Sequence, residues 1–149
     1  MKINLTKKQY RDLMEVVLLG NWIRGGLYDQ GLYDNKNYDE IENYLIGFAK
    51  EFQCNDLVEK FHDEEIISDN FGKKIESLME SYDDFNFWDN LERRLGQRDF
   101  YESMTEKDRK EMKNDNWLPE RIHEIYKMYE KEFEKHGIEQ LRIKKKIIN

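Results

Sequence analysis

The residues best suited to chemistry in this sequence are three histidines, one cysteine and a dense set of carboxylates. Cys54 follows an apolar segment at the predicted end of a helix, where the helix dipole disfavours the thiolate that a nucleophile requires. His62 begins the acidic run HDEE, and His123 follows Glu120 at i, i+3 spacing. No local motif joins these groups into a nucleophile and a base. We therefore predict no catalytic residues, and an enzyme or enzyme subunit with a dispersed active site is the alternative.

Two segments have part of the pattern of a metal site. Asp29–Glu40 spans twelve residues with an acid at each end, as in an EF-hand loop, but its sixth position is Asp34, where that loop needs glycine. Glu120 and His123 have the spacing used in di-iron bundles, but the sequence lacks the second such pair and the further carboxylates. We expect no metal ligands and no cofactor.

The sequence also argues against several other classes of function. It contains no P-loop, no G-x-G-x-x-G, no G-x-S-x-G and no H-E-x-x-H. A pI of about 5.1 and short basic clusters make direct nucleic-acid binding unexpected. No apolar run approaches the ~18 residues that span a bilayer, the N-terminus MKINLTKK has no apolar segment, and there is one cysteine. These features predict a cytoplasmic protein that does not enter membranes.

The negative charge is concentrated in the middle of the chain. Residues 26–92 carry 18 Asp and Glu against five Lys, a net charge of −13, whereas the two flanks are each +3. An acidic surface attracts basic partners and speeds their encounter. If the partner's basic surface normally holds nucleic acid, the protein would compete by imitating phosphates.

Within this block, the segment from Gly26 to Tyr38 has the composition of a recognition loop. It consists mainly of Gly, Asp, Asn and Tyr, and includes the tandem repeat GLYDQ–GLYDN. Tyrosine offers a large amphipathic contact at low entropic cost. A second acidic segment, His62–Asn70, follows later in the chain. We predict that partner-binding residues lie in these two segments, namely Tyr28, Asp29, Tyr33, Asp34, Tyr38, Asp63, Glu64, Glu65 and Asp69.

The function predicted is thus a non-enzymatic, acidic, protein-binding regulator. One form of it is an inhibitor that acts as a nucleic-acid mimic, and phage-encoded antagonists of host defence have this size and acidity. A homo-oligomeric structural module, in which the aromatic loop mediates self-association, is a third hypothesis. The partner expected in the first case is a protein with a basic surface.

The elements that would position these residues are mainly helical. Thr6 and Gln9 form a capping box for a helix that runs to Ile23, apolar on nearly all faces and therefore central, with Gly25–Gly26 ending it. Helical spacing of apolar residues continues over 41–52, 71–82 and 87–95. Asp83, Asp84 and Asn86 are expected to interrupt the last two segments.

The C-terminal third shows helix signals and then a change of period. Thr105 and Asp108 mark the start of a charged helix, and Pro119 and Gly137 bracket the last long one. Residues 141–147 alternate between apolar and basic, which predicts a strand that pairs with Ile3–Leu5. We predict one globular domain over residues 1–149, mainly α, as a compact bundle of five to six helices with a small two-stranded β pairing of the N- and C-terminal segments.

Overall fold

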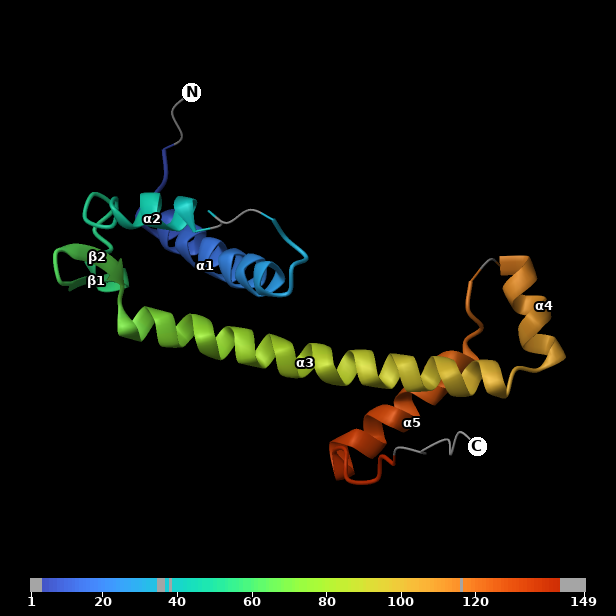
Figure 1. Ribbon diagram of the computed structural model, residues 1–149. Helices are drawn as coiled ribbons and strands as arrows, with labels where there is room; N and C mark the ends of the chain where they lie inside the picture. The colour runs from blue at the N-terminus through green and yellow to red at the C-terminus, as the bar shows by residue number, and fades with distance from the viewer. Residues whose placement is uncertain (1–3, 35–36, 38, 116, 143–149) are drawn as a thin grey trace. The chain divides into compact units, whose positions relative to one another are not determined.

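The computed structural model describes residues 4–34, 37, 39–115 and 117–142. This part of the chain forms five α-helices, one 3-10 turn and a two-stranded antiparallel sheet (Figure 1). They are α1 (Lys7–Asp29), α2 (Glu40–Ile46), η1 (Asn55–Leu57), β1 (Val58–Phe61), β2 (Glu64–Ile67), α3 (Asp69–Glu102), α4 (Glu106–Asp115) and α5 (Arg121–His136). The predicted mainly α fold with a small β pair is confirmed. The chain divides into two compact units, Met1–Ser81 (unit 1) and Tyr82–Asn149 (unit 2).

Helix α1 begins where the sequence predicts and ends later. Thr6 accepts a hydrogen bond from the backbone N–H of Gln9, and the Gln9 side chain accepts one from the Thr6 backbone, which completes the capping box. The predicted stop at Gly25–Gly26 is wrong, because the helix continues to Asp29. The actual terminator is Gly31, whose φ is +68°.

The end of α1 is a Schellman motif. The N–H of Leu32 donates to the carbonyl of Leu27 at 2.8 Å, and the N–H of Gly31 donates to the carbonyl of Tyr28 at 2.9 Å. These two bonds satisfy carbonyls that a helix end leaves unpaired. Glycine inside a helix costs only about 1 kcal/mol relative to alanine, so this terminal motif decides where the helix ends.

The core of unit 1 forms between one face of α1, the segment around α2, and the start of α3. Tyr10 is fully buried, stacks on Phe52 with ring centroids 4.5 Å apart, and donates its hydroxyl to the carbonyl of Leu45 at 2.7 Å. Burial raises the pKa of Tyr10 to about 12, so its hydroxyl stays a donor. Other buried apolar members of this core are Met14, Ile46, Ala49, Cys54, Leu57, Phe71 and Ile75.

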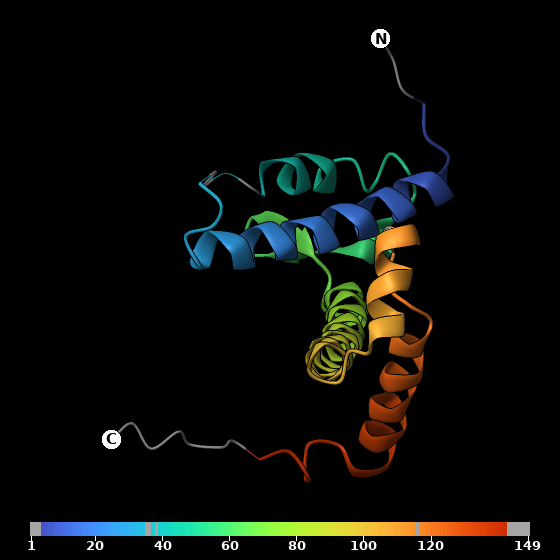
Figure 2. The same ribbon diagram turned by 90° about the vertical axis from the view of Figure 1, so that its right-hand side faces the viewer.

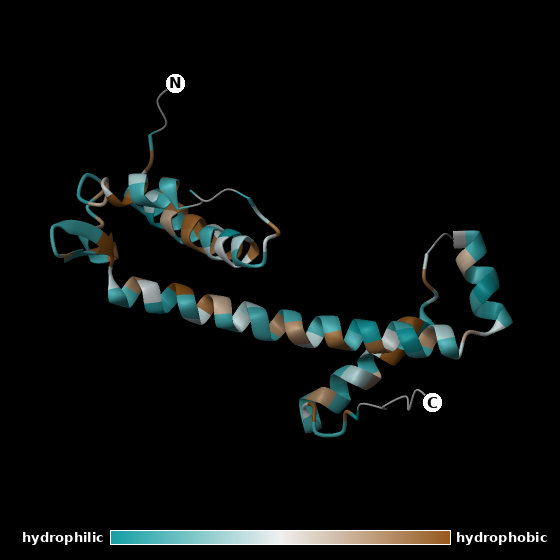
Figure 3. Ribbon diagram, viewed as in Figure 1, coloured by the Kyte–Doolittle hydropathy of each residue, from teal (hydrophilic) through white to brown (hydrophobic). Residues whose placement is uncertain are grey.

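Only one face of α1 is buried, which corrects the prediction of a helix surrounded by the core. Val16 is 65% exposed, and Ile23 and Leu27 are also exposed. The apolar residues of this helix are the brown bands in Figure 3, which colours the ribbon by hydropathy.

Helix α2 is shorter than its apolar pattern indicates. It ends at Ile46 instead of continuing to Phe52, and Ile41 and Tyr44 are exposed although the pattern placed them on the buried face. Residues 47–53 form turns that bury Ala49. The chain folds back after Gly31. Figures 1 and 2 both show that α2 therefore lies beside α1.

The acidic segment His62–Asn70 contains the turn and the second strand of a β-hairpin, and then the start of α3. Strands β1 and β2 pair antiparallel, with Val58 opposite Ile67 and Phe61 opposite Glu64. The 3-10 turn η1 ends at Leu57, and β1 begins at the next residue. His62 lies in the turn between the strands with a φ of +54°.

Helix α3 is continuous, so the predicted interruption at Asp83, Asp84 and Asn86 is wrong. In unit 2 its C-terminal part packs against α5. A Cβ on Gly96 would overlap the ring of Tyr126, so a glycine is required where the two helices approach each other. The buried residues of α5 are Ile122, Ile125 and Phe133.

Helix α4 is the charged helix that the sequence predicts, and Figure 3 shows it mostly in the teal of hydrophilic residues. Gly137 ends α5 with a φ of +54°, also as predicted. The predicted pairing of the chain termini falls mainly on residues 1–3 and 143–149, outside the described residues. The only sheet in the described part is the hairpin. Organisation as a single domain stays a prediction.

Candidate functional site

The first group of predicted partner-binding residues lies at the C-terminal end of α1. Tyr28 and Asp29 are its last two residues and are exposed, and Asp34 is exposed in the loop that follows. Tyr33 is only half-exposed, because its hydroxyl accepts a hydrogen bond from Arg24 Nε at 3.1 Å. The same guanidinium stacks over the Tyr33 ring at 5.4 Å. Tyr38 lies outside the described residues.

The second group lies on the hairpin and at the start of α3. Glu64 and Glu65 are in β2, Asp63 is in the turn, and all three are exposed. Asp69 is the first residue of α3 and pairs with Lys73 Nζ at 2.6 Å, so its charge already has a cation nearby.

The structure separates these two groups. The region of the hairpin is tied to the N-terminal half of α1, where Arg11 makes a bidentate ion pair with Asp56 and Lys74 pairs with Glu15. From Arg11 to Asp29 a helix rises by roughly 27 Å at about 1.5 Å per residue. One bound side chain cannot therefore contact both groups.

A groove of about 410 Å³ lies beside the C-terminal half of α1, next to the first group. We call it the Trp22 groove. One lining residue comes from α2 and the rest from α1: Leu18, Asn21, Trp22, Gly25, Gly26, Asp29 and Glu42. Trp22 is 43% exposed, so part of its indole is available for contact. Asp29 is the only predicted site residue in this lining.

The electrostatics of the groove are set by two carboxylates and one amide. Asn21 is only 6% exposed and donates from Nδ2 to Glu42 Oε2 at 2.9 Å. Its Oδ1 accepts a longer bond, 3.4 Å, from Arg24, whose guanidinium is turned toward Tyr33. Among the described residues, no Lys or Arg forms an ion pair with Asp29 or Glu42.

This arrangement is chemically suited to hold a cation that also has a flat or apolar part. Carboxylates accept charge-assisted hydrogen bonds, and an indole face attracts a cation that lies over it. Sequence analysis missed Trp22, Asn21 and Glu42, because the first two belong to a helix that was expected to be central and Glu42 lies outside the two predicted binding segments. The signal that could have indicated the groove is the Gly25–Gly26 pair inside the helix.

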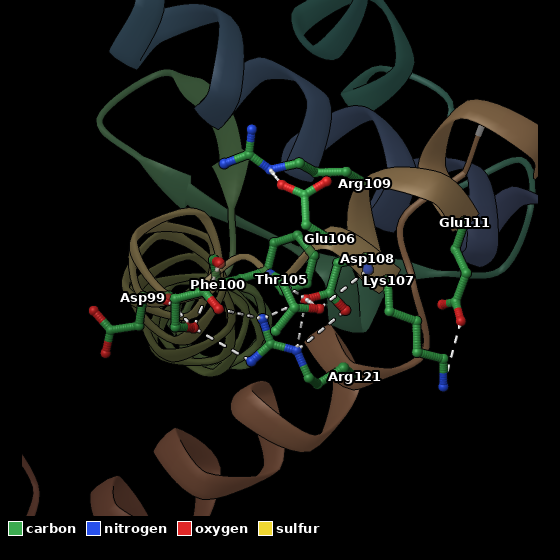
Figure 4. Close-up of polar contacts among 10 residues, drawn as sticks. Asp99, Phe100, Thr105, Glu106, Lys107, Asp108, Arg109, Glu111 and Arg121 are labelled. Atoms are coloured by element: carbon green, nitrogen blue, oxygen red, sulfur yellow. Dashed lines mark hydrogen bonds and ion pairs between the residues drawn. The ribbon is translucent and has the colours of Figure 1, made fainter.

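One carboxylate of unit 2, Asp108, makes a contrast with this groove (Figure 4). Asp108 is 3% exposed and accepts hydrogen bonds from the backbone N–H and the hydroxyl of Thr105, at 2.8 and 2.7 Å. Arg121 donates to it from Nη2 at 2.9 Å and lies over the ring of Phe100 at 5.0 Å. The pKa of Asp108 is lowered to about 2, mainly by Arg121 and then by Thr105. This cluster joins α3, α4 and α5, and both oxygens of Asp108 accept hydrogen bonds from Arg121.

A second hollow, of about 500 Å³, lies in unit 2. Its wall includes Arg98 and Tyr129, which are hydrogen-bonded to each other at 3.1 Å, and both contact Asp99. The side chains of Arg98 and Asp99 therefore balance each other's charge.

The remaining reactive groups lie apart from both hollows. Cys54 is fully buried, and its thiol contacts the carbonyls of Lys7 and Phe52. His62 and His123 are exposed, and their rings contact Phe61 and Tyr126 respectively. Neither histidine lines the Trp22 groove or the hollow in unit 2.

The described residues contain neither a cluster of metal ligands nor a helix that could cross a membrane. Among these residues, His, Cys, Asp and Glu nowhere gather in threes with the geometry to hold a metal ion. Within the same ranges, every helix falls short of the length and apolarity that crossing a membrane requires. No protein-family model, curated protein or solved structure matches the chain.

Proposed function

We propose that this protein is a non-enzymatic regulator that binds a protein partner with a basic surface through the Trp22 groove. The observation that supports this most strongly is the pair of groove carboxylates, Asp29 and Glu42. They lie beside an exposed indole, and no cation of the described residues is paired with either of them. A basic side chain from a partner would supply the missing charge.

The charge of unit 1 supports the same partner class. Residues 1–81 carry 16 acidic and ten basic side chains, a net charge of −6, whereas residues 82–149 are at −1. Such a field attracts a basic surface before contact and raises the association rate at low salt. A partner that uses this basic surface to hold nucleic acid would be inhibited, because the carboxylates would occupy the sites of the phosphates.

The experiment that tests this function begins with the protein recovered by cross-linking to the wild-type chain in cell extract. The purified partner is then titrated with wild type and with the double variant Asp29→Asn, Glu42→Gln. We expect the double variant to bind at least about tenfold more weakly, since a hydrogen bond to a charged group is worth about 1.5–3 kcal/mol. The matched control is Asp63→Asn, Glu64→Gln, Glu65→Gln on the hairpin.

The control removes more negative charge than the double variant and leaves the groove intact. It should therefore weaken binding less, through the long-range field alone. A larger loss in the hairpin control than in the groove variant would contradict the proposed site. Equal affinity of all three proteins for the partner would contradict the proposed function itself.

A further inference from the structure

The glycines of this protein differ in whether its own packing requires them. Gly96 is required, because a Cβ there would overlap Tyr126. Gly26 is not, because a Cβ there would have no atom within 4 Å, although it lies inside α1, where alanine is the better residue. Gly26 also lines the Trp22 groove, so it leaves the helix backbone open to an approaching group.

Hydrogen bonds hold the polar groups of the groove in place, and a carboxylate oxygen remains that can accept a further bond. Asn21 uses its amide N–H on Glu42 Oε2 and its carbonyl on Arg24, so this buried amide is satisfied on both sides. It acts as a positioning residue, because it fixes one oxygen of Glu42. Among the described residues, no other hydrogen bond to Glu42 is formed, and its second oxygen can accept one. Asp29 lines the same groove from the last turn of α1.

These features match one kind of side chain better than others. A guanidinium is planar, stacks on an aromatic face, and carries N–H donors in a rigid fork that can reach two carboxylates at once. A lysine ammonium is a compact and strongly hydrated point charge, which gains less from an indole wall and cannot form the same fork. The groove provides the indole of Trp22, two carboxylates that accept hydrogen bonds, and backbone at Gly26 that no side chain covers.

We propose that the Trp22 groove binds an arginine side chain of the partner, with the guanidinium against Trp22, its N–H groups on Asp29 and Glu42, and the segment that carries it close to Gly26. This inference deepens the function proposed above and rests on it. The recognised feature is an arginine side chain rather than positive charge in general.

The direct test uses three short peptides, acetyl-Ala-X-Ala-amide, in which X is arginine, lysine or citrulline. Citrulline keeps the shape of arginine without its charge. The readout is the NMR signal of the Trp22 indole N–H in the full chain, assigned by its absence in Trp22→Phe. We expect the arginine peptide to bind about tenfold more tightly than the lysine peptide, and the citrulline peptide to cause no saturable shift.

The outcomes separate the two proposals. Equal affinity for arginine and lysine overturns the arginine assignment and leaves a basic-surface regulator standing. No shift with any peptide, while partner binding still depends on Asp29 and Glu42, also overturns it. Partner binding that is indifferent to both carboxylates overturns the proposed function.

A matched pair of glycine variants gives a second, independent readout. Gly26→Ala places a methyl group on the groove floor and should weaken the arginine peptide about fivefold. Gly20→Ala makes the same change in the same helix, also with no atom within 4 Å of the new Cβ, and lies outside the groove lining. It should leave the affinity unchanged. Both variants should fold, so unaltered affinity in Gly26→Ala would overturn the close approach to the backbone.

Discussion

Asp108 in unit 2 and Glu42 in unit 1 are both hydrogen-bonded carboxylates, but their surroundings differ. Asp108 is buried and accepts bonds from Thr105 and from the guanidinium of Arg121. Glu42 is half-exposed and accepts one bond from the neutral amide of Asn21. A carboxylate whose acceptors and charge are fully matched within the chain stabilises the fold. A carboxylate held in place without a cation is suited to receive one from outside.

The first way to sharpen this comparison is to remove the apolar surface under the paired cluster of unit 2. Phe100 is fully buried and lies beneath Arg121. Phe100→Ala should lower the free energy of unfolding by about 3–5 kcal/mol, because it deletes a ring and leaves a cavity. Chemical denaturation monitored by circular dichroism measures this. A loss below about 1 kcal/mol would mean that the cluster is not a structural centre.

Acid should reveal the paired carboxylate through its lowered pKa. Asp108 has a pKa of about 2 in the fold against an ordinary value of 3.8, so the folded state binds its proton less readily than the unfolded state. Its contribution to stability is therefore complete above about pH 4 and is lost as the pH falls toward 2. Asp99 has a lowered pKa because of Arg98 and then Tyr129, and acts in the same direction.

The measurement is the pH dependence of the thermal midpoint in wild type and in Asp108→Asn. The variant should be less stable at neutral pH and should lose less stability between pH 4 and pH 2 than wild type. Parallel curves for the two proteins would contradict the role given to this carboxylate.

The groove carboxylate should show the opposite behaviour. Glu42→Gln should change the free energy of unfolding by no more than about 0.5 kcal/mol, as expected for a surface position without an ion pair. It should weaken the arginine peptide about tenfold, since it removes a charge-assisted acceptor. Isothermal denaturation measures the change in the free energy of unfolding, and the NMR titration measures the change in affinity for the arginine peptide. A marked stability loss with unchanged binding would reverse the assignment of roles.

The smallest expected effects concern glycine. Gly20→Ala and Gly26→Ala should each stabilise unit 1 by about 0.5–1 kcal/mol, because alanine is the better helix former and both positions are open. Gly96→Ala should destabilise unit 2, since its Cβ would overlap Tyr126. Thermal unfolding of the three variants measures their stabilities relative to wild type. Destabilisation by all three would show that the two α1 glycines have a packing role.

Local sequence signals predicted the helix ends well where the whole signal lies within a few residues. The capping boxes at Thr6 and Thr105 and the terminating Gly137 are examples. The hairpin could not be predicted in this way, because its turn uses His62 in a positive-φ conformation and not an Asn-Gly or Asp-Gly pair. Two glutamates at the start of β2 also favour a loop over a strand.

The groove could not be predicted from the sequence for a different reason. Trp22 and Glu42 are far apart in the sequence and share a surface only because α2 folds back beside α1. The helix continues through Gly25 and Gly26 because the Schellman motif at Gly31 ends it later. A prediction that ends the helix at Gly25 separates Trp22 from Asp29 and cannot assemble the site. Asp29 is the one lining residue that the composition of its segment predicted to bind a partner.

The most direct test of the central claim is the salt dependence of partner binding in wild type and in the double variant Asp29→Asn, Glu42→Gln. If the groove receives a basic side chain, the affinity of wild type should fall steeply with ionic strength, because partly exposed charges are screened. The double variant should bind more weakly at low salt and show a shallower dependence. Equal affinities and equal salt slopes for the two proteins would contradict the account.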